Sequence, residues 1–316
     1  MSFNKILAAT TFSLSLAIAA GAVQAADPES CKAVRFSDVG WTDITATTAA
    51  TSVVLQALGY EPEVQLLSVP VTYTSLKNKD IDVFLGNWMP TMTADIEPYL
   101  ADSSVEQLRV NLEGAKYTLA VPKYAADGGL KDFADIAKFK DQLDGKIYGI
   151  EPGNDGNRLI QDMIDNDAFG LKGFELVESS EQGMLAEVAR SARSDGWIVF
   201  LGWEPHPMNS NFELAYLSGG DDHFGPDFGG ATVYTNVRAG YASECPNVGK
   251  LLNNLSFTLA MENEIMGKIL DDGMEANAAA AEWLKANPGT LDGWLAGVTA
   301  IDGGDGMTAV KSGLGL

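Results

Sequence analysis

The chain has 316 residues, with 43 aspartate and glutamate residues against 21 lysine and arginine residues. A net charge of −22 disfavours nucleic acid and anionic lipid as partners, since both select basic proteins. The length allows two ordinary domains, each with a hydrophobic core. The chain contains only two histidines and has no HExxH, CxxC, GxSxG or Walker motif, which argues against a catalytic zinc site and against a nucleotide site.

The first 25 residues have the pattern of an export signal. Lys5 precedes an apolar run from Ile6 to about Ala20, and small residues lead up to Ala25. The run is too short for a membrane span, and no other stretch reaches 18 apolar residues. We therefore expect cleavage after Ala25 and a soluble protein in the periplasm. A monomer is expected, because capture of one small molecule needs only one copy of the chain.

Cys31 and Cys245 are the only two cysteines in the sequence. An exported chain meets an oxidising compartment, so a disulfide between them is expected. Such a bond would place the first strand and the segment near residue 245 in one lobe. The chain between the two cysteines would then leave that lobe and return to it.

Apolar runs and helix-like periods alternate along the rest of the chain. Strands are predicted at 34–36, 64–69, 81–85, 117–121, 146–150, 175–178, 197–201 and 231–237. Helices are predicted at 42–58, 72–78, 157–164 and 181–193, with a helical region at 247–286. This alternation predicts an α/β protein with a parallel sheet in each of two lobes. We place lobe 1 at 26–113 and 232–316 and lobe 2 at 114–231, with a loose Gly-rich tail from Gly303 onward.

Three tryptophans lie just beyond the carboxyl ends of predicted strands, at Trp41, Trp88 and Trp203. Asn154 follows another strand in the same way. These loops converge where α/β sheets bind ligands. Indole faces attract cations, so the pattern suggests a cage for a quaternary ammonium, with Asp43 close by.

A simpler interpretation of the first of these loops remains open. Trp41 could pack in the core while Thr42 or Asp43 caps the following helix, because both residue types are favoured at that position. The recurrence of the pattern at three strands favours the cage. The other three tryptophans, Trp197, Trp283 and Trp294, are interpreted as packing residues.

Five ordered motifs identify a resemblance to a known family. They are VGWTD at 39–43, DVFLGNWMP at 82–90, GAKYTLAVP at 114–122, YGIEPGNDGN at 148–157 and FLGWEPHPMN at 200–209. Over essentially all of the mature chain the sequence resembles the substrate-binding proteins of ABC importers for glycine betaine, proline betaine and choline, and looks most like choline-binding members. The resemblance implies a type II periplasmic-binding-protein fold, no enzymatic activity, no cofactor or metal, and an ABC permease as partner.

The resemblance also implies a set of ligand-binding residues. Lobe 1 would provide Trp41, Asp43 and Trp88, and lobe 2 would provide Tyr117, Asn154 and Trp203. In this interpretation four aromatic rings form a box, Asp43 is the counter-ion of the ammonium, and Asn154 hydrogen-bonds the ligand hydroxyl. Tyr117 is at the start of its predicted strand, so its assignment depends on the resemblance alone.

Asp43 bears on the choice of substrate. A carboxylate here would repel the acid group of a betaine, so choline is expected, with acetylcholine bound more weakly. Glycine betaine or proline betaine remains an alternative, because His206 could hold a carboxylate, although its two flanking prolines favour a loop role. A secreted hydrolase is the alternative from another class. The acidic pair Asp221 and Asp222 suits a solvated turn better than a catalytic pair, and a turnover assay on choline esters would separate the two classes.

Overall fold

The structure is a computed structural model, and it describes residues 27–316. The predicted export signal lies outside the described residues. Within them, nine strands form one mixed sheet in the order β2-β1-β3-β9-β4-β7-β5-β6, with β8 paired to β4. No helix in this part of the chain combines the length and the apolar content needed to cross a bilayer.

The strands are β1 (Ala33–Asp38), β2 (Glu61–Leu66), β3 (Val83–Met89), β4 (Val105–Pro122), β5 (Lys146–Tyr148), β6 (Glu175–Val177), β7 (Phe200–Glu204), β8 (Leu214–Tyr216) and β9 (Gly230–Arg238). The α-helices are α1 (Thr42–Ala57), α2 (Val69–Asn78), α3 (Thr93–Ala101), α4 (Lys123–Asp127), α5 (Phe133–Ile136), α6 (Asp155–Asp165), α7 (Glu181–Ala192), α8 (Met208–Asn211), α9 (Asp221–Phe224), α10 (Pro226–Gly229), α11 (Tyr241–Glu244), α12 (Pro246–Asn254), α13 (Leu259–Leu270), α14 (Ala276–Ala286), α15 (Thr290–Trp294) and α16 (Gly306–Leu314).

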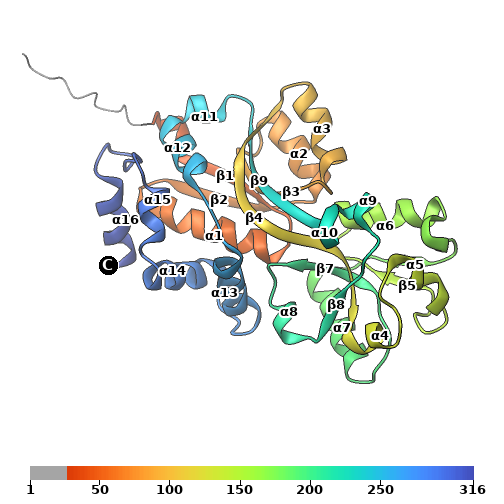
Figure 1. Cartoon of the computed structure of the whole chain (residues 1–316). Helices are drawn as coiled ribbons and strands as arrows, with labels where there is room; N and C mark the ends of the chain where they lie inside the picture. The colour runs from red at the N-terminus through yellow and green to blue at the C-terminus, as the bar shows by residue number, and fades with distance from the viewer. Residues whose placement is uncertain (1–26) are drawn as a thin grey trace, which may run out of the picture.

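The sheet has a parallel part at each end. β1 pairs in parallel with β2 and β3, and β5 pairs in parallel with β6 and β7. The long strands β4 and β9 run antiparallel to each other across the middle of the molecule and connect the two parts (Figure 1). The predicted α/β fold with two lobes is therefore confirmed, with lobe 1 containing β1–β3 and lobe 2 containing β5–β7. The two parallel parts belong to one continuous sheet, which the sequence did not indicate.

The exact division between the lobes remains a prediction. Gly114 lies inside β4 and Thr232 lies inside β9, so both predicted boundaries fall in the two connecting strands. Gly114 has φ of +77°, and the register of β4 against β9 shifts between Leu112 and Ala115. A positive φ interrupts regular strand geometry.

Several strand positions differ from the sequence-based expectation by a few residues. The strand predicted at 117–121 is only the last part of β4, which begins at Val105. Trp88 and Trp203 lie within β3 and β7 near their carboxyl ends, not in the loops that follow. Local pattern fixes a strand's apolar centre better than its ends, because the ends depend on which neighbours the strand finds.

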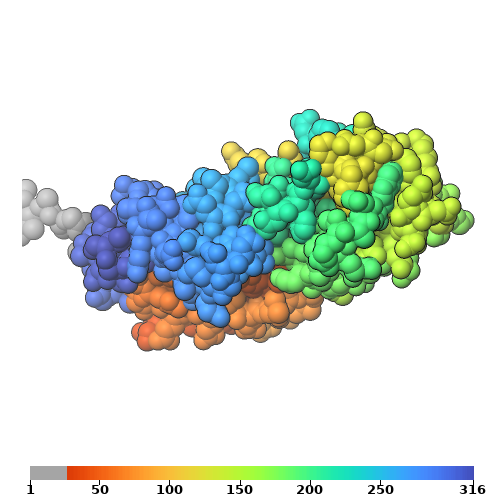
Figure 2. Space-filling model, turned by 90° about the horizontal axis from the view of Figure 1, so that it is seen from below, coloured from red at the N-terminus to blue at the C-terminus, as the bar shows by residue number. Residues whose placement is uncertain are grey.

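The C-terminal segment is not the loose extension that was expected. Residues 306–314 form α16, and the side chains of Val310 and Leu314 are buried. α16 contacts α1, where a Cβ added to Gly313 would lie 2.7 Å from the Cβ of Ala57. Figure 2 shows the C-terminal segment packed against the N-terminal one, while the middle of the chain makes up the other end of the molecule.

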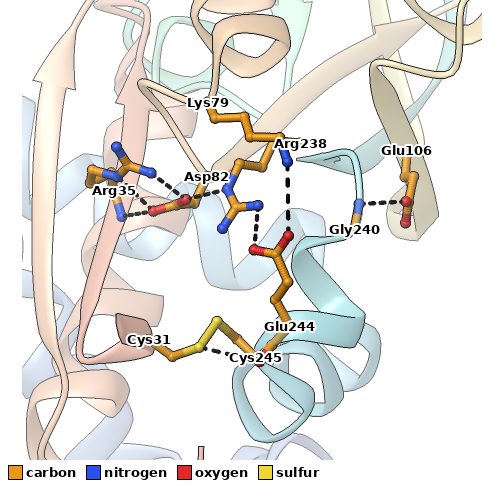
Figure 3. A network of polar contacts seen from close by, with 9 residues as sticks. All are labelled: Cys31, Arg35, Lys79, Asp82, Glu106, Arg238, Gly240, Glu244 and Cys245. Atoms are coloured by element: carbon orange, nitrogen blue, oxygen red, sulfur yellow. Dashed lines mark hydrogen bonds and ion pairs between the residues drawn. A yellow bond between two sulfur atoms is a disulfide. The ribbon is translucent and has the colours of Figure 1, made fainter. Parts of the chain in front are cut away.

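A disulfide joins Cys31 to Cys245, as predicted, with 5.6 Å between the Cα atoms. Beside it lies a network of charged side chains, shown in Figure 3. The carboxylate of Asp82 accepts hydrogen bonds from Arg35 and Arg238 at 2.7–2.9 Å. Burial acts to raise the pKa of Asp82, but these hydrogen bonds outweigh it and leave the pKa below its ordinary value.

Reduction of the disulfide is expected to lower the stability of the protein without changing its ligand site. The bond closes a loop across a separation of 214 residues, and its loss should cost about 2 kcal/mol or more, or roughly 4–8 °C in melting temperature. Cys31 precedes β1 and Trp41 follows it, so about 20 Å of strand separates bond and site. Thermal melts monitored by circular dichroism, with and without reductant, test this. With or without reductant, the Cys31→Ser/Cys245→Ser variant should melt at the temperature of the wild-type protein in reductant. A wild-type melting temperature that reductant does not change would contradict the prediction.

Candidate ligand-binding site

A small cavity lies where the two lobes meet. Its lining residues are Trp41, Asp43, Trp88, Tyr117, Ile150 and Trp203. The side chains lie close together, because a water-sized sphere can occupy only about 10 Å³ of the space between them. The cavity is therefore nearly filled by its own walls and leaves room for a small ligand only if these side chains move apart. The structure brings together five of the six predicted site residues.

The aromatic rings of the cavity are arranged mainly edge to face around Tyr117. Its ring centroid lies 6.0 Å from that of Trp88 and 6.3 Å from that of Trp203, with interplanar angles of 62° and 83°. Phe224 packs behind Tyr117 at 5.9 Å and 90°. Edge-to-face contacts between large buried rings fix their orientation, so their faces are held in place before a ligand arrives.

The loop after β1 places Trp41 and Asp43 at the start of α1. Gly40 has φ of +87°, a conformation that favours glycine, and it turns the chain from strand to helix. Trp41 is the N-cap residue of α1 and its side chain makes no capping hydrogen bond, while the side chains of Thr42 and Asp43 bond to Glu181 and Trp88, so neither has the capping role considered above. Trp41 is buried, yet its side chain lines the cavity.

Asp43 is the only acidic residue lining the cavity, and its side chain is just 1% exposed. Its Oδ2 accepts a hydrogen bond of 3.2 Å from Nε1 of Trp88, and its Oδ1 has no hydrogen-bond partner in the structure. Burial, together with the nearby charge of Glu181, raises the pKa of Asp43 to about 8. The cavity thus contains an acid that no basic side chain of its lining compensates.

Asn154 lies next to the cavity and contacts it through Tyr117. It is the N-cap of α6, and its Oδ1 accepts hydrogen bonds from the backbone N of Asn157 at 2.8 Å and from the Tyr117 hydroxyl at 3.3 Å. A Cβ added to Gly156 would lie 2.0 Å from that hydroxyl, so only glycine permits this approach. Asn154 therefore orients Tyr117, and its predicted hydrogen bond to a ligand hydroxyl remains a prediction.

His206 is buried and fully engaged within the protein. Its Nδ1 accepts a hydrogen bond of 2.9 Å from the backbone N of Met208, and its Nε2 lies 3.2 Å from Oε1 of Glu181. With Nδ1 as acceptor, Nε2 is the ring nitrogen that donates. Both ring nitrogens have partners, so His206 is not placed to hold a ligand carboxylate. The pair Asp221 and Asp222 lies exposed at the start of α9, as a solvated turn would.

Two residues of this region were missed by the sequence analysis. Ile150 lines the cavity just after β5. It belongs to the motif at 148–157, but the sequence analysis treated it only as the last residue of the strand predicted at 146–150. Glu181 is buried beside the cavity at the start of α7. Sequence alone gave no indication of its burial, since Glu is common in the first turn of exposed helices.

Comparison with known proteins places this chain among transport proteins. Residues 32–286 match OpuAC, the substrate-binding domain of ABC-type glycine betaine transport systems. An uncharacterized protein, ORF1, of Chromohalobacter salexigens is 57% identical over 129 residues, which are 41% of this chain and 83% of that protein.

Two solved structures are similar over nearly the whole described chain. An ABC-transporter choline-binding protein in complex with choline is 71% identical with a TM-score of 0.90, and the alignment covers 91% of this chain and 100% of that one. An ABC-transporter choline-binding protein in an unliganded semi-closed conformation is 72% identical over the same shares, with a TM-score of 0.84. The chain therefore belongs to the OpuAC family of substrate-binding domains of ABC-type glycine betaine transport systems.

Proposed function

We propose that this protein captures choline outside the cytoplasm and delivers it to the permease of an ABC importer. The observation that supports this most directly is the cavity itself, in which four aromatic side chains and one buried carboxylate face a small space. A quaternary ammonium has no N–H to donate, so ring faces and a counter-ion are the groups that can recognise it. The relative of 71% identity is itself described in complex with choline.

The cavity lining favours choline over betaines. Its six residues include no lysine, arginine or histidine to hold a carboxylate, and Asp43 would repel one when it is ionised. The same box should accept acetylcholine more weakly, because the ester is larger than the hydroxyl of choline. A ligand of seven heavy atoms is limited to roughly −10 kcal/mol by ligand efficiency, so the expected dissociation constant is on the order of micromolar.

Closure of the two lobes explains how the site captures its ligand. Trp41, Asp43 and Trp88 come from lobe 1, Tyr117 from the connecting strand β4, and Trp203 from β7 of lobe 2. A ligand between them contacts both groups only when the lobes are together, so binding shifts the population toward the closed form. That form would then be recognised by the permease.

Titration calorimetry with choline, acetylcholine, glycine betaine and proline betaine tests the proposal. Choline is expected to bind most tightly, acetylcholine more weakly, and the betaines more weakly still or not at all. Glycine betaine binding more tightly than choline would assign the protein to the betaine alternative. Hydrolysis of acetylcholine during the titration would instead support an enzyme.

Choline affinity is expected to increase with pH up to about pH 8. With the lobes together and no cation bound, the pKa of Asp43 is about 8, so below that pH its carboxyl is protonated and a bound cation must displace the proton. The bound cation stabilises the carboxylate and lowers its pKa, so affinity should change by up to about tenfold per pH unit below pH 8 and level off above it. Glu181 and Glu262 are further buried acids beside Asp43, and neither supplies a compensating positive charge.

Calorimetric titrations from pH 5.5 to 9 in buffers of different ionisation enthalpy measure both the slope and the proton released on binding. Asp43→Asn is the control, because it keeps the shape of the side chain but has no proton to release. A wild-type profile as flat as that of Asp43→Asn would show that Asp43 does not titrate on binding.

A further inference from the structure

Glu181 is a fully buried carboxylate that contacts residues from both lobes without lining the cavity. It is 0% exposed and is the first residue of α7 in lobe 2. Its Oε2 accepts a hydrogen bond of 2.8 Å from the backbone N of Thr42, and its Oε1 accepts one of 2.5 Å from the Thr42 hydroxyl. Its Oε1 also lies 3.2 Å from Nε2 of His206. All three residues are buried, and hydrogen bonds to a carboxylate are stronger than those between neutral groups.

The partners of Glu181 lie directly beside the aromatic residues of the cavity. Thr42 lies between Trp41 and Asp43 in the chain. The imidazole of His206 packs edge to face on the indole of Trp203, with 4.8 Å between ring centroids. Glu181 thus joins the loop that places Trp41 and Asp43 in lobe 1 to the loop that follows Trp203 in lobe 2.

The start of α1 makes this contact favourable for an anion. The first backbone N–H groups of a helix have no partner within the helix, and the N-terminus has a partial positive charge. Glu181 fills this position on α1, which has no side-chain cap of its own. If the lobes separate, the helix end and the carboxylate both return to water, so the contact belongs to the closed arrangement.

A second direct link between the lobes near the cavity is more exposed to solvent. Arg158 of α6 reaches Asp95 of α3 at 2.7 Å, but about a third of its side chain is exposed. Ion pairs with such exposure contribute little, typically about 0–1 kcal/mol. Glu181, by contrast, is fully buried and contacts Thr42, which lies between Trp41 and Asp43 in the chain.

We propose that Glu181 is a positioning residue that locks the closed form around the ligand and thereby sets how long choline stays bound. This inference rests on the proposed function, since it concerns the same site. Glu181 acts through Thr42 and His206 and touches no ligand, so its loss should leave encounter with the open site unchanged. It should instead speed opening of the closed complex.

Stopped-flow tryptophan fluorescence with choline, together with thermal melts of the ligand-free chain, tests this inference on four proteins. Glu181→Ala removes the carboxylate and Thr42→Val removes only the hydroxyl donor. Both are expected to raise the dissociation rate by about tenfold or more while the association rate stays within twofold of wild type. Glu187→Ala removes a partly exposed glutamate of the same helix, whose carboxylate pairs with Arg190, and as the matched control it should dissociate like wild type.

The melting temperature of the ligand-free chain shows whether Glu181 stabilises only the closed form or the fold in general. Without ligand, Thr42→Val should melt at the same temperature as wild type. With choline it should melt at a lower temperature than wild type, because the hydrogen bond between Thr42 and Glu181 forms only in the closed form. If Glu181→Ala does not fold, Thr42→Val decides alone. Two results would overturn the proposed role of Glu181. One is a wild-type dissociation rate in both variants, and the other is a melting temperature that falls as much without choline as with it. Failure of the wild-type chain to bind choline would overturn the proposed function instead.

Discussion

Replacing Trp203 by alanine is expected to weaken choline binding by about 2–4 kcal/mol, or roughly 30- to 1,000-fold. Trp203 is 3% exposed and is held by edge-to-face contacts with Tyr117 and His206. The substitution removes one wall of the cavity, so the ammonium loses a buried ring face. It also leaves Tyr117 without the ring that orients it from the side of β7.

Isothermal titration calorimetry measures this loss, and the chain offers a matched control. Trp197 is a tryptophan of the same lobe that packs on Phe139 with 4.8 Å between ring centroids and does not line the cavity. Trp197→Ala should lower the melting temperature yet bind choline with wild-type affinity per folded molecule. An affinity of Trp203→Ala within twofold of wild type would refute the aromatic cage.

Replacing Asp43 by asparagine is expected to weaken choline binding by about 2–5 kcal/mol, more than it weakens glycine betaine. The substitution keeps the shape of the side chain and an oxygen that can accept the hydrogen bond of Trp88 Nε1. What it removes is the one negative charge in the cavity lining. A bound choline would then be a buried cation without a counter-ion, and such a charge is strongly destabilised.

The comparison between two ligands serves as the internal control for this variant. Glycine betaine contains its own carboxylate, which Asp43 repels, so loss of the charge has opposing effects on that ligand and should change its affinity less. Calorimetry of both ligands on both proteins at pH 8.5, where the wild-type carboxyl is mostly ionised, gives the coupling directly. An equal loss for the two ligands would mean that Asp43 is not the counter-ion.

These two predictions concern residues that the sequence singled out for different reasons. Trp41, Trp88 and Trp203 were found from local pattern, since each lies at the carboxyl end of a predicted strand and parallel strands place those ends together. Tyr117 could not be found in this way. It lies well inside the long strand β4, and only the resemblance to a family indicated it.

Elements with strong local patterns were predicted well, and elements that depend on partners were not. β1 and β3 are encoded by their buried apolar residues, and the helix α1 is encoded by a run of mostly small and apolar residues. The tail from Gly303 onward was expected to be loose because it is rich in glycine, and a helix as short as α16 is stable only through packing. Its partner, α1, is more than 240 residues away in the sequence.

The sequence by itself determined the alternation of strands and helices, the two cysteines that pair, and the kind of side chain available to bind a cation. Only the tertiary structure decided that β4 and β9 connect both lobes, that Asp43 lies in a site without a basic residue, and that Glu181 meets Thr42 across 139 positions. The physical reason is the distance along the chain over which each effect acts. Backbone pattern acts over a few neighbouring residues, whereas burial, pKa and contacts between lobes depend on groups that only the folded chain brings together.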